Sequence, residues 1–338
     1  MPRTHRPLAT ADRFRALFAD RAIRAADAHA AGFTRDQLRA AVRRGLLASP
    51  RRGILIASPD HGSGLDAYDA WRCAHLARVA TRMALLGPTA VGTHASAAAV
   101  WALRIIDSPG PEVVTAIKPG EADFAAPGLV VRNGELPAHV VRRIDGLLVT
   151  DIRRTAIDLA RGQALPRALI PLDDAARRLV ARASGTEGPA LRSAVHDQKW
   201  RTIARRELDD AIMTCRGWPG VVAVRNALEH VDPASESPFE SRSRGWFLEG
   251  GIRSLEIGAP IHVGATTYWA DFCDRERRVI GEADGWAKYG VTAEEVRRAL
   301  RAERIRQDRL TSDGWTFVRW SGGDSRWDVV TRMQAALR

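Results

Sequence analysis

Three carboxylates in one short stretch are the clearest candidates for chemistry in this sequence. Asp271, Glu282 and Asp284 lie in two otherwise apolar segments that flank the turn 274–277. Apolar segments around such a turn predict a β-hairpin. If the two strands pair symmetrically about the turn, Asp271 faces Ile280, and all three carboxylates share one face of the sheet.

A shared face would bring like charges together inside apolar strands. Their repulsion lowers the stability of the fold unless a cation lies among them. Because carboxylate oxygens are hard ligands, the cation that fits is Mg²⁺ or Mn²⁺. The pattern therefore predicts a metal site at Asp271, Glu282 and Asp284. The alternative is a side of the strands that only faces solvent.

The helix that must precede these strands begins with a strong start signal. Ser237 and Pro238 occupy the cap and first positions, Glu240 completes a capping box, and Gly250 ends the helix. The capping box alone accounts for Glu240, and a place in the chemical site is the second interpretation.

The helix after the hairpin places two polar side chains on its apolar side. A capping box of Thr292 and Glu295 begins this helix, which runs to Leu310. Glu303 and Gln307 share a side with the apolar residues, so we expect both to face the interior. Polar residues on a buried side indicate a site or a satisfied buried pair.

A strand at 315–320 and a last helix complete the order helix, strands, hairpin, helix, strand, helix. From Glu236 to about Trp320 the sequence resembles the very-short-patch-repair-like branch of the PD-(D/E)XK endonucleases. The resemblance rests on the segments 236–241, 270–272, 282–285, 288–289, 303–310 and 314–319. It implies a C-terminal restriction-endonuclease-like α/β/α domain over residues 236–338.

The resemblance also implies roles for the acids. Asp271 and Glu282 would bind the metal and act in catalysis. Glu240 would be the auxiliary acid, and Glu303 is a further catalytic candidate because it faces the same interior.

The expected lysine of this superfamily is missing. It would stand two residues after Glu282, where this sequence has Asp284. Lys288, one of only three lysines, would supply the ammonium group instead, and Arg306 is the other candidate. The substitution leaves the fold prediction intact and leaves catalysis open.

The positive charge of the chain is concentrated near its N-terminus. The net charge is +11, and residues 1–57 hold twelve arginines against four aspartates. Residues 236–338 hold seventeen basic and sixteen acidic residues. A basic module of this kind favours a polyanionic partner, here double-stranded DNA.

Local signals in residues 1–60 predict a winged helix-turn-helix. A helical stretch with Phe14 and Ile23 precedes a second helix, which starts at a capping box of Thr34 and Gln37 and closes at Gly45. Two short strands follow. The predicted DNA-binding residues are Arg35, Arg39 and Arg43 on one helix face and Arg51 and Arg52 at the tip of the wing. The alternative is a helix face that is only solvated.

Residues 20–160 resemble the abortive-infection type IV (AbiEi) antitoxin family. The resemblance rests on the segments 32–34, 51–53, 93–98 and 145–150. The whole chain is then a multidomain α/β protein, similar to actinobacterial AbiEi-type antitoxin-like proteins that carry a nuclease domain. Its expected parts are the module 1–60, an antitoxin-like α+β domain 66–160, a helical connector 161–234 and the domain 236–338.

Composition and cysteine usage argue against a membrane-spanning, secreted, disulfide-stabilised or zinc-binding protein. Apolar residues make up 45% and charged residues 27%, as in an ordinary globular protein. The absence of a long apolar run predicts no membrane span and no signal peptide. Three distant cysteines predict neither a disulfide framework nor a zinc site, so we expect a cytoplasmic protein.

Two functions remain open at this point. One is a Mg²⁺- or Mn²⁺-dependent DNA endonuclease in phage defence or a toxin–antitoxin system. The other is an antitoxin-type DNA-binding transcriptional regulator whose nuclease fold has lost catalysis. In either case the implied partners are DNA and a cognate toxin.

Overall fold

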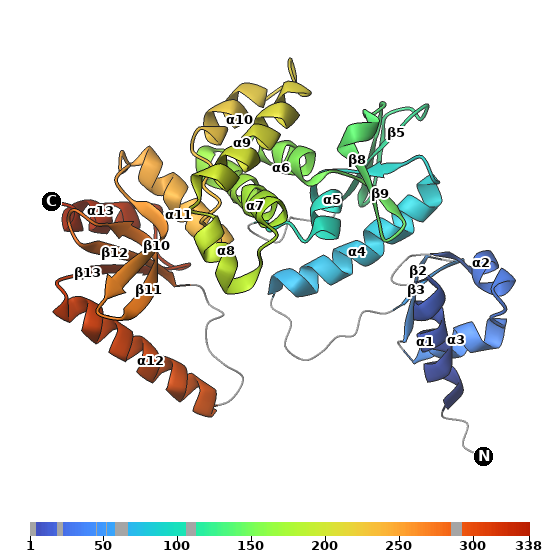
Figure 1. Ribbon diagram of the computed structural model, residues 1–338. Coiled ribbons are helices and arrows are strands. Elements are labelled where there is room, and N and C mark those ends of the chain that lie inside the picture. Colours follow the sequence, from blue (N-terminus) through green and yellow to red (C-terminus); the bar gives the residue numbers. More distant parts are fainter. Residues whose placement is uncertain are drawn as a thin grey trace. The chain divides into compact units, whose positions relative to one another are not determined.

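The computed structural model divides into two compact units, which Figure 1 shows in sequence colours. Unit 1 holds residues 1–103 and 107–158, and unit 2 holds residues 104–106 and 159–338. The finer division into four parts stays a prediction. No helix in the described part of the chain is long and apolar enough to cross a membrane. The structure describes residues 5–18, 23–44, 46–51, 53–57, 67–105, 113–284 and 293–338.

Unit 1 begins with three helices and a small antiparallel sheet of order β1-β3-β2. The capping box of Thr34 and Gln37 is present, because each side chain accepts a hydrogen bond from the other residue's backbone N–H. Ile23, expected in a helix, instead lies in strand β1 and pairs with Leu55. The elements are α1 (His5–Phe18), β1 (Ile23–Arg24), α2 (Ala25–Ala30), α3 (Arg35–Arg43), β2 (Leu47–Arg51) and β3 (Ile54–Ala57).

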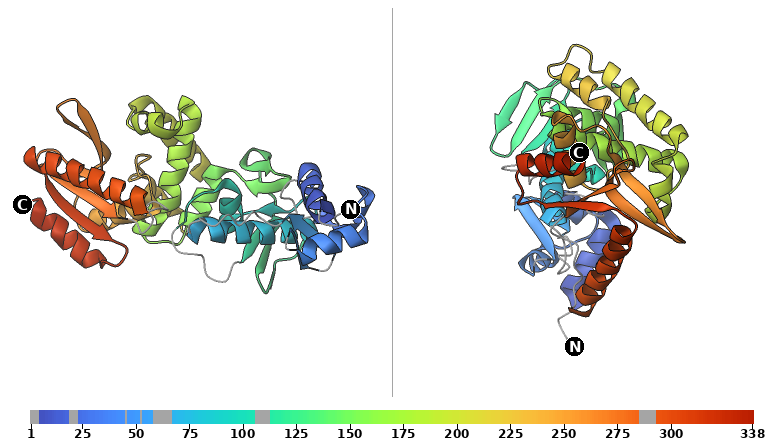
Figure 2. Two further views of the ribbon diagram at one scale, coloured as in Figure 1. Left: turned by 90° about the horizontal axis from the view of Figure 1, so that it is seen from below. Right: turned by 90° about the vertical axis from the view of Figure 1, so that its left-hand side faces the viewer.

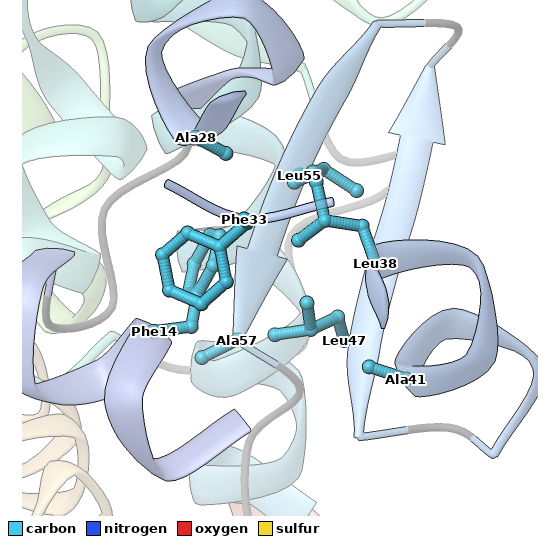
Figure 3. Packing of buried hydrophobic residues seen from close by; sticks show 8 residues of the cluster. All are labelled: Phe14, Ala28, Phe33, Leu38, Ala41, Leu47, Leu55 and Ala57. Atoms are coloured by element: carbon cyan, nitrogen blue, oxygen red, sulfur yellow. The ribbon is translucent and has the colours of Figure 1, made fainter. Parts of the chain in front are cut away.

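A compact apolar core holds these short elements together (Figure 3). The rings of Phe14 and Phe33 lie 5.8 Å apart, centroid to centroid. Leu38 and Ala41 of α3 point into the same core. Because one side of α3 is buried in this way, the side that carries its arginines is exposed.

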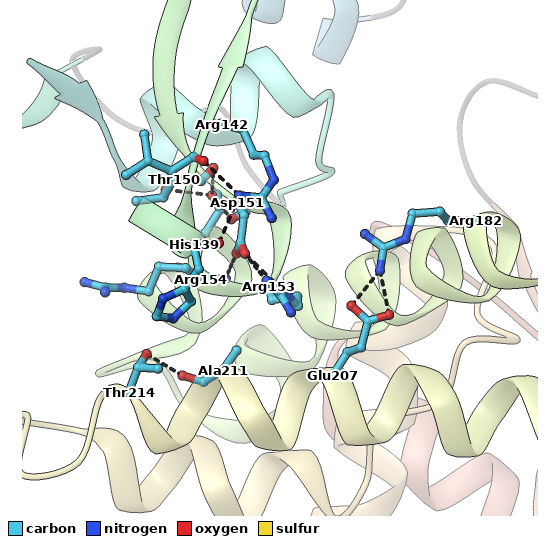
Figure 4. A network of polar contacts seen from close by, with 12 residues as sticks. His139, Arg142, Thr150, Asp151, Arg153, Arg154, Arg182, Glu207, Ala211 and Thr214 are labelled. Carbon is cyan, nitrogen blue, oxygen red and sulfur yellow. Dashed lines mark hydrogen bonds and ion pairs between the residues drawn. The ribbon is translucent and has the colours of Figure 1, made fainter. Parts of the chain in front are cut away.

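The rest of unit 1 is a six-stranded mixed sheet of order β6-β7-β5-β4-β9-β8 with helices α4 and α5. Asp151 caps helix α6 by accepting a 2.9 Å hydrogen bond from the backbone N–H of Arg154, and it also pairs with Arg153 (Figure 4). The hydroxyl group of Thr150, the residue before Asp151, lies 2.8 Å from that of Thr155. The elements are α4 (Ala67–Leu86), β4 (Val91–Gly92), α5 (His94–Trp101), β5 (Val114–Lys118), β6 (Phe124–Ala126), β7 (Leu129–Asn133), β8 (Val141–Ile144), β9 (Leu147–Thr150) and α6 (Ile152–Ala160).

Unit 2 starts with helices that pack closely on one another and on α11. Arg182 of α7 pairs with Glu207 of α9 at 2.5 Å (Figure 4). A Cβ atom at Gly245 of α11 would lie 2.3 Å from the Cα atom of Pro166, so the two helices touch backbone to backbone there. The helices are α7 (Leu165–Ser184), α8 (Gly188–Ala194), α9 (Gln198–Met213), α10 (Val221–Leu228) and α11 (Pro238–Glu249).

A four-stranded sheet of order β10-β11-β12-β13 forms the rest of unit 2, with β12 and β13 parallel. Leu310 of α12 packs beside Ile280 on one face. Phe247 of α11 packs edge-on against Phe272 and Trp320 on the other face. In the left view of Figure 2 the strands lie between α12 and α13. The elements are β10 (Glu256–Val263), β11 (Thr266–Asp274), β12 (Val279–Asp284), α12 (Ala293–Ser312), β13 (Thr316–Ser321) and α13 (Arg326–Ala336).

The register of the β11–β12 hairpin differs from the predicted one by two residues. Ile280 pairs with Cys273 and not with Asp271. The reason lies in the turn, where the Asp274 carboxylate accepts a 2.8 Å hydrogen bond from the backbone N–H of Arg277 and so belongs to the end of the strand. A shift of two residues keeps every side chain on its predicted face, because the strand period is two.

Candidate functional site

The predicted acids converge on one cavity of unit 2, with a volume of about 500 Å³. The sheet contributes its acids from β11 and β12, and the helices α11 and α12 contribute one acid each. Arginines from three elements line the same cavity. The acids are Glu240, Asp271, Glu282, Asp284 and Glu303, together with Glu236, and the arginines are Arg192, Arg306 and Arg319.

Glu282 lies at the centre of a carboxylate–guanidinium network. It is buried, and Arg306 donates a 2.6 Å hydrogen bond to its Oε1 atom. The same guanidinium donates to Glu303 at 3.1 Å and to the backbone oxygen of Trp269 at 3.0 Å. Arg319 also donates to Glu303. Guanidinium groups therefore supply positive charge where the sequence predicted a metal ion.

Gln307 does not face this network, which corrects one expectation. Its side chain is exposed, whereas Arg306 and Leu310 face the sheet. The inward side of α12 is therefore the stripe of Glu303, Arg306 and Leu310, at helical spacing i, i+3, i+7.

Glu240 is both a helix cap and a member of the cavity. It is 6% exposed, and its carboxylate accepts hydrogen bonds from the Glu236 N–H at 2.7 Å and the Ser237 hydroxyl at 2.8 Å. Burial, together with the nearby charge of Asp271, raises the pKa of Glu240 to about 8. Both interpretations of this residue are thus compatible with its position.

Asp271 and Glu282 influence each other through space. One Asp271 oxygen accepts a 2.8 Å hydrogen bond from the Ala283 N–H. Burial and the charge of Asp271 raise the pKa of Glu282 to about 7, although Arg306 acts in the opposite direction. Asp284 stands at the position of the missing lysine, and its Oδ2 atom lies 3.6 Å from the Nη1 atom of Arg319.

The chemistry of these donors fits a divalent cation. Buried carboxylates with raised pKa values gain most from an added positive charge, and their oxygens are the ligands that Mg²⁺ and Mn²⁺ prefer. In the described residues no three His, Cys, Asp or Glu side chains are grouped closely enough to hold a metal ion. Binding would therefore require the acids to move closer together, and Glu282 would exchange Arg306 for the cation.

One wall of the cavity was not predicted from the sequence. Arg192 pairs with Glu236 through two contacts of 2.8 and 2.9 Å. Trp269 lines the cavity beside them. Since Trp269 precedes Asp271 by two residues in one strand, the strand period could have identified it. Nothing in the sequence connects Arg192, which is far away along the chain, with this strand.

The predicted DNA-binding residues lie in unit 1. Arg35, Arg39 and Arg43 are exposed on α3. Arg51 is the last residue of β2, while Arg52 lies outside the described residues. Lys288, the predicted catalytic ammonium, also lies outside them.

Comparisons with known proteins add information about the middle of the chain. Residues 83–209 match the family model described as the AbiEi antitoxin C-terminal domain. Two uncharacterized proteins of Mycobacterium tuberculosis, from the strains CDC 1551 / Oshkosh and H37Rv, are each 28% identical over 244 residues, covering 72% of this chain and 78% of the relative. The matched range includes the segments 93–98 and 145–150, and it runs from α4 in unit 1 to α9 in unit 2. Over residues 83–209 the chain is therefore similar to AbiEi antitoxins.

Proposed function

We propose that this protein is a DNA-binding, metal-dependent endonuclease that acts in phage defence or beside a cognate toxin. The single observation that carries the proposal is the convergence of Asp271, Glu282 and Glu240 on one cavity at a β-sheet that helices cover on both faces. The elements from α11 to α13 follow the order helix, strands, hairpin, helix, strand, helix. This is also the element order of the PD-(D/E)XK endonucleases that the sequence resembles.

The residues of the cavity have separate roles in this proposal. Asp271 and Glu282 would hold a divalent cation, which when bound supplies a Lewis acid and an activated water. Arg306 would turn from Glu282 towards the scissile phosphate and balance the charge that develops there. Glu303 keeps Arg306 close to the site, because it accepts a 3.1 Å hydrogen bond from that guanidinium.

Helix α3 would bring the duplex to the protein. Its exposed arginines, Arg35, Arg39 and Arg43, can contact phosphates of any sequence, so binding should depend strongly on salt. No disulfide joins Cys73, Cys215 and Cys273, which all lie in the described part of the chain, and this supports the proposed location in the cytoplasm.

A second candidate is an antitoxin-type DNA-binding regulator without cleavage activity. The observation that favours it is the pairing of acids with arginines in the cavity, where Arg306 and Arg319 form ion pairs with Glu282, Glu303 and Asp284. These ion pairs offset part of the negative charge of the cavity without a metal ion.

Plasmid cleavage separates the two candidates. Purified full-length protein is incubated with supercoiled plasmid in Mn²⁺, in Mg²⁺ and in EDTA, and thermal melting is measured under the same conditions. The endonuclease predicts metal-dependent nicking together with a rise in melting temperature. Binding of plasmid without nicking in any metal would leave the regulator.

A further inference from the structure

The unpredicted wall of the cavity contains an aromatic surface beside the acids. Trp269 is half-buried and lines the cavity that also contains Asp271 and Glu282. Since Trp269 and Asp271 are two residues apart in β11, they lie on the same face of the sheet. An indole ring and the candidate catalytic acids are therefore presented to the same ligand.

A residue outside the sheet packs against the indole. The ring of His196, which follows α8, stacks on Trp269 with a centroid distance of 6.1 Å and an interplanar angle of 26°. His196 is itself held in place, because its Nε2 lies 2.8 Å from the carbonyl oxygen of Gly258 and must donate its proton there. His196 does not line the cavity, so the indole is the surface that a ligand would meet.

A cation adds to this aromatic surface. The guanidinium of Arg192 lies 5.8 Å from the centre of the Trp269 ring and lines the cavity itself. Glu236 fixes its orientation through two hydrogen bonds. An aromatic ring next to an arginine is the combination that binds a nucleobase by stacking and its phosphate by charge.

We propose that Trp269, stacked with His196 and flanked by Arg192, is a stacking platform for one unpaired nucleobase of the DNA strand that enters the cavity. The inference rests on the proposed function, since it needs DNA at this site. A paired base is covered by its neighbours in the duplex and does not offer its ring face. A stacking platform therefore predicts that the protein prefers single-stranded or locally opened DNA. The acids alone predict no such preference.

The test compares two labelled single-stranded oligonucleotides in fluorescence anisotropy titrations with full-length protein. One carries all its bases, and the other has three adjacent abasic positions in its middle. Ca²⁺ replaces Mn²⁺ so that no strand is cut. The arginines of unit 1 contact phosphates and should bind both strands equally, so the ratio of the two affinities reports on stacking.

Wild-type protein should bind the complete strand about tenfold more tightly than the abasic one. Trp269→Ala should abolish this ratio, whereas Trp269→Phe should keep most of it because a ring remains. Trp327→Ala is the matched control. Trp327 also lies beside an arginine, Arg326 at 4.5 Å, but it is 67% exposed and is not part of the cavity.

The proposal is overturned if wild type shows no preference for the complete strand, or if the preference survives in Trp269→Ala. Melting temperatures of both Trp269 variants show whether the fold is kept, and if the alanine variant unfolds, Trp269→Leu, which fills the space without a ring, carries the test and should lose the ratio. Nicking of plasmid in Mn²⁺ is measured in parallel. Protein that nicks without a base preference refutes only the platform, and protein with the preference that never nicks refutes only the endonuclease.

Discussion

The arginines of helix α3 and those of the unit 2 cavity differ in their surroundings. Arg35, Arg39 and Arg43 project into solvent from a helix whose other side is buried. Arg306 and Arg319 instead lie against carboxylates and are mostly buried. An exposed arginine attracts polyanions over a distance set by the salt concentration, whereas a buried one balances local charge. The net charge of the sequence therefore indicated the exposed arginines of α3, but it did not indicate the arginines of the cavity, whose charge is offset by nearby carboxylates.

The strongest test of this comparison removes the acids of the cavity. Glu282→Gln and Asp271→Asn should each lower the rate of plasmid nicking by about 10³-fold, because the charge that holds the cation is lost. Initial rates of nicking in Mn²⁺ measure the effect. Glu276→Gln, in the exposed hairpin turn, is the control and should cut normally. Full cutting by Glu282→Gln would show that the cavity is not the active site.

A buried arginine should matter for stability and not for DNA binding. Arg244 of α11 pairs with Asp173 of α7 at 2.6 Å, and both are buried. Arg244→Met leaves a buried carboxylate without its partner, so it should lower the free energy of unfolding by about 3 kcal/mol. Denaturant unfolding measures this. Arg178→Met breaks the more exposed pair with Asp174 and should cost less than about 1 kcal/mol. Equal losses in both variants would contradict the comparison.

Exposed arginines should show the opposite behaviour. Arg39→Ala with Arg43→Ala should weaken duplex binding about tenfold at moderate salt and reduce the slope of log affinity against log salt by about two. The free energy of unfolding should change little. Gel-shift titrations over a range of salt provide the measurement, with Arg206→Ala/Arg216→Ala, two exposed arginines of unit 2, as the matched variant. An unchanged affinity at low salt would exclude α3 as the DNA contact.

The smallest expected effect is a pH dependence confined to unit 2. The pKa of Glu240 is raised from 4.5 to about 8, so the folded state binds its proton more tightly than the unfolded state. Stability from this group is complete below about pH 4.5 and is lost as pH rises towards 8. In metal-free protein the melting temperature of Glu240→Gln relative to wild type should therefore increase over that range. A difference that does not change with pH would show that Glu240 titrates normally.

Sequence reasoning succeeded where the signal is local. The caps Thr34 and Ser237 bond within three residues of themselves, so their patterns determine where α3 and α11 begin. Side-chain parity in β11 and β12 was predicted although their register was not, because a slip of two residues does not change the face. The C-terminal order of helices and strands followed from the same local signals.

The features that could not be predicted from the sequence depend on tertiary packing. Helix α12 has charged residues on most of its surface, so apolar spacing placed Gln307 inside, while the structure turns Arg306 towards Glu282. The wall formed by Arg192 and Trp269 joins residues 77 positions apart, and no short-range pattern reports such a contact. The ion pair of Arg306 with Glu282 could not be predicted from the sequence either, because the two residues lie in different elements.

The backbone contact between Gly245 and Pro166 has a consequence for how this protein can change over generations. It locks α11 to α7, and α7 belongs to the segment that is similar to AbiEi antitoxins. A stop codon after residue 235 would remove α11, expose the side of α7 that packs against it, and leave the buried Asp173 without Arg244. Selection can therefore preserve the C-terminal fold as a scaffold for the antitoxin-like segment, even in descendants whose catalytic acids have been replaced.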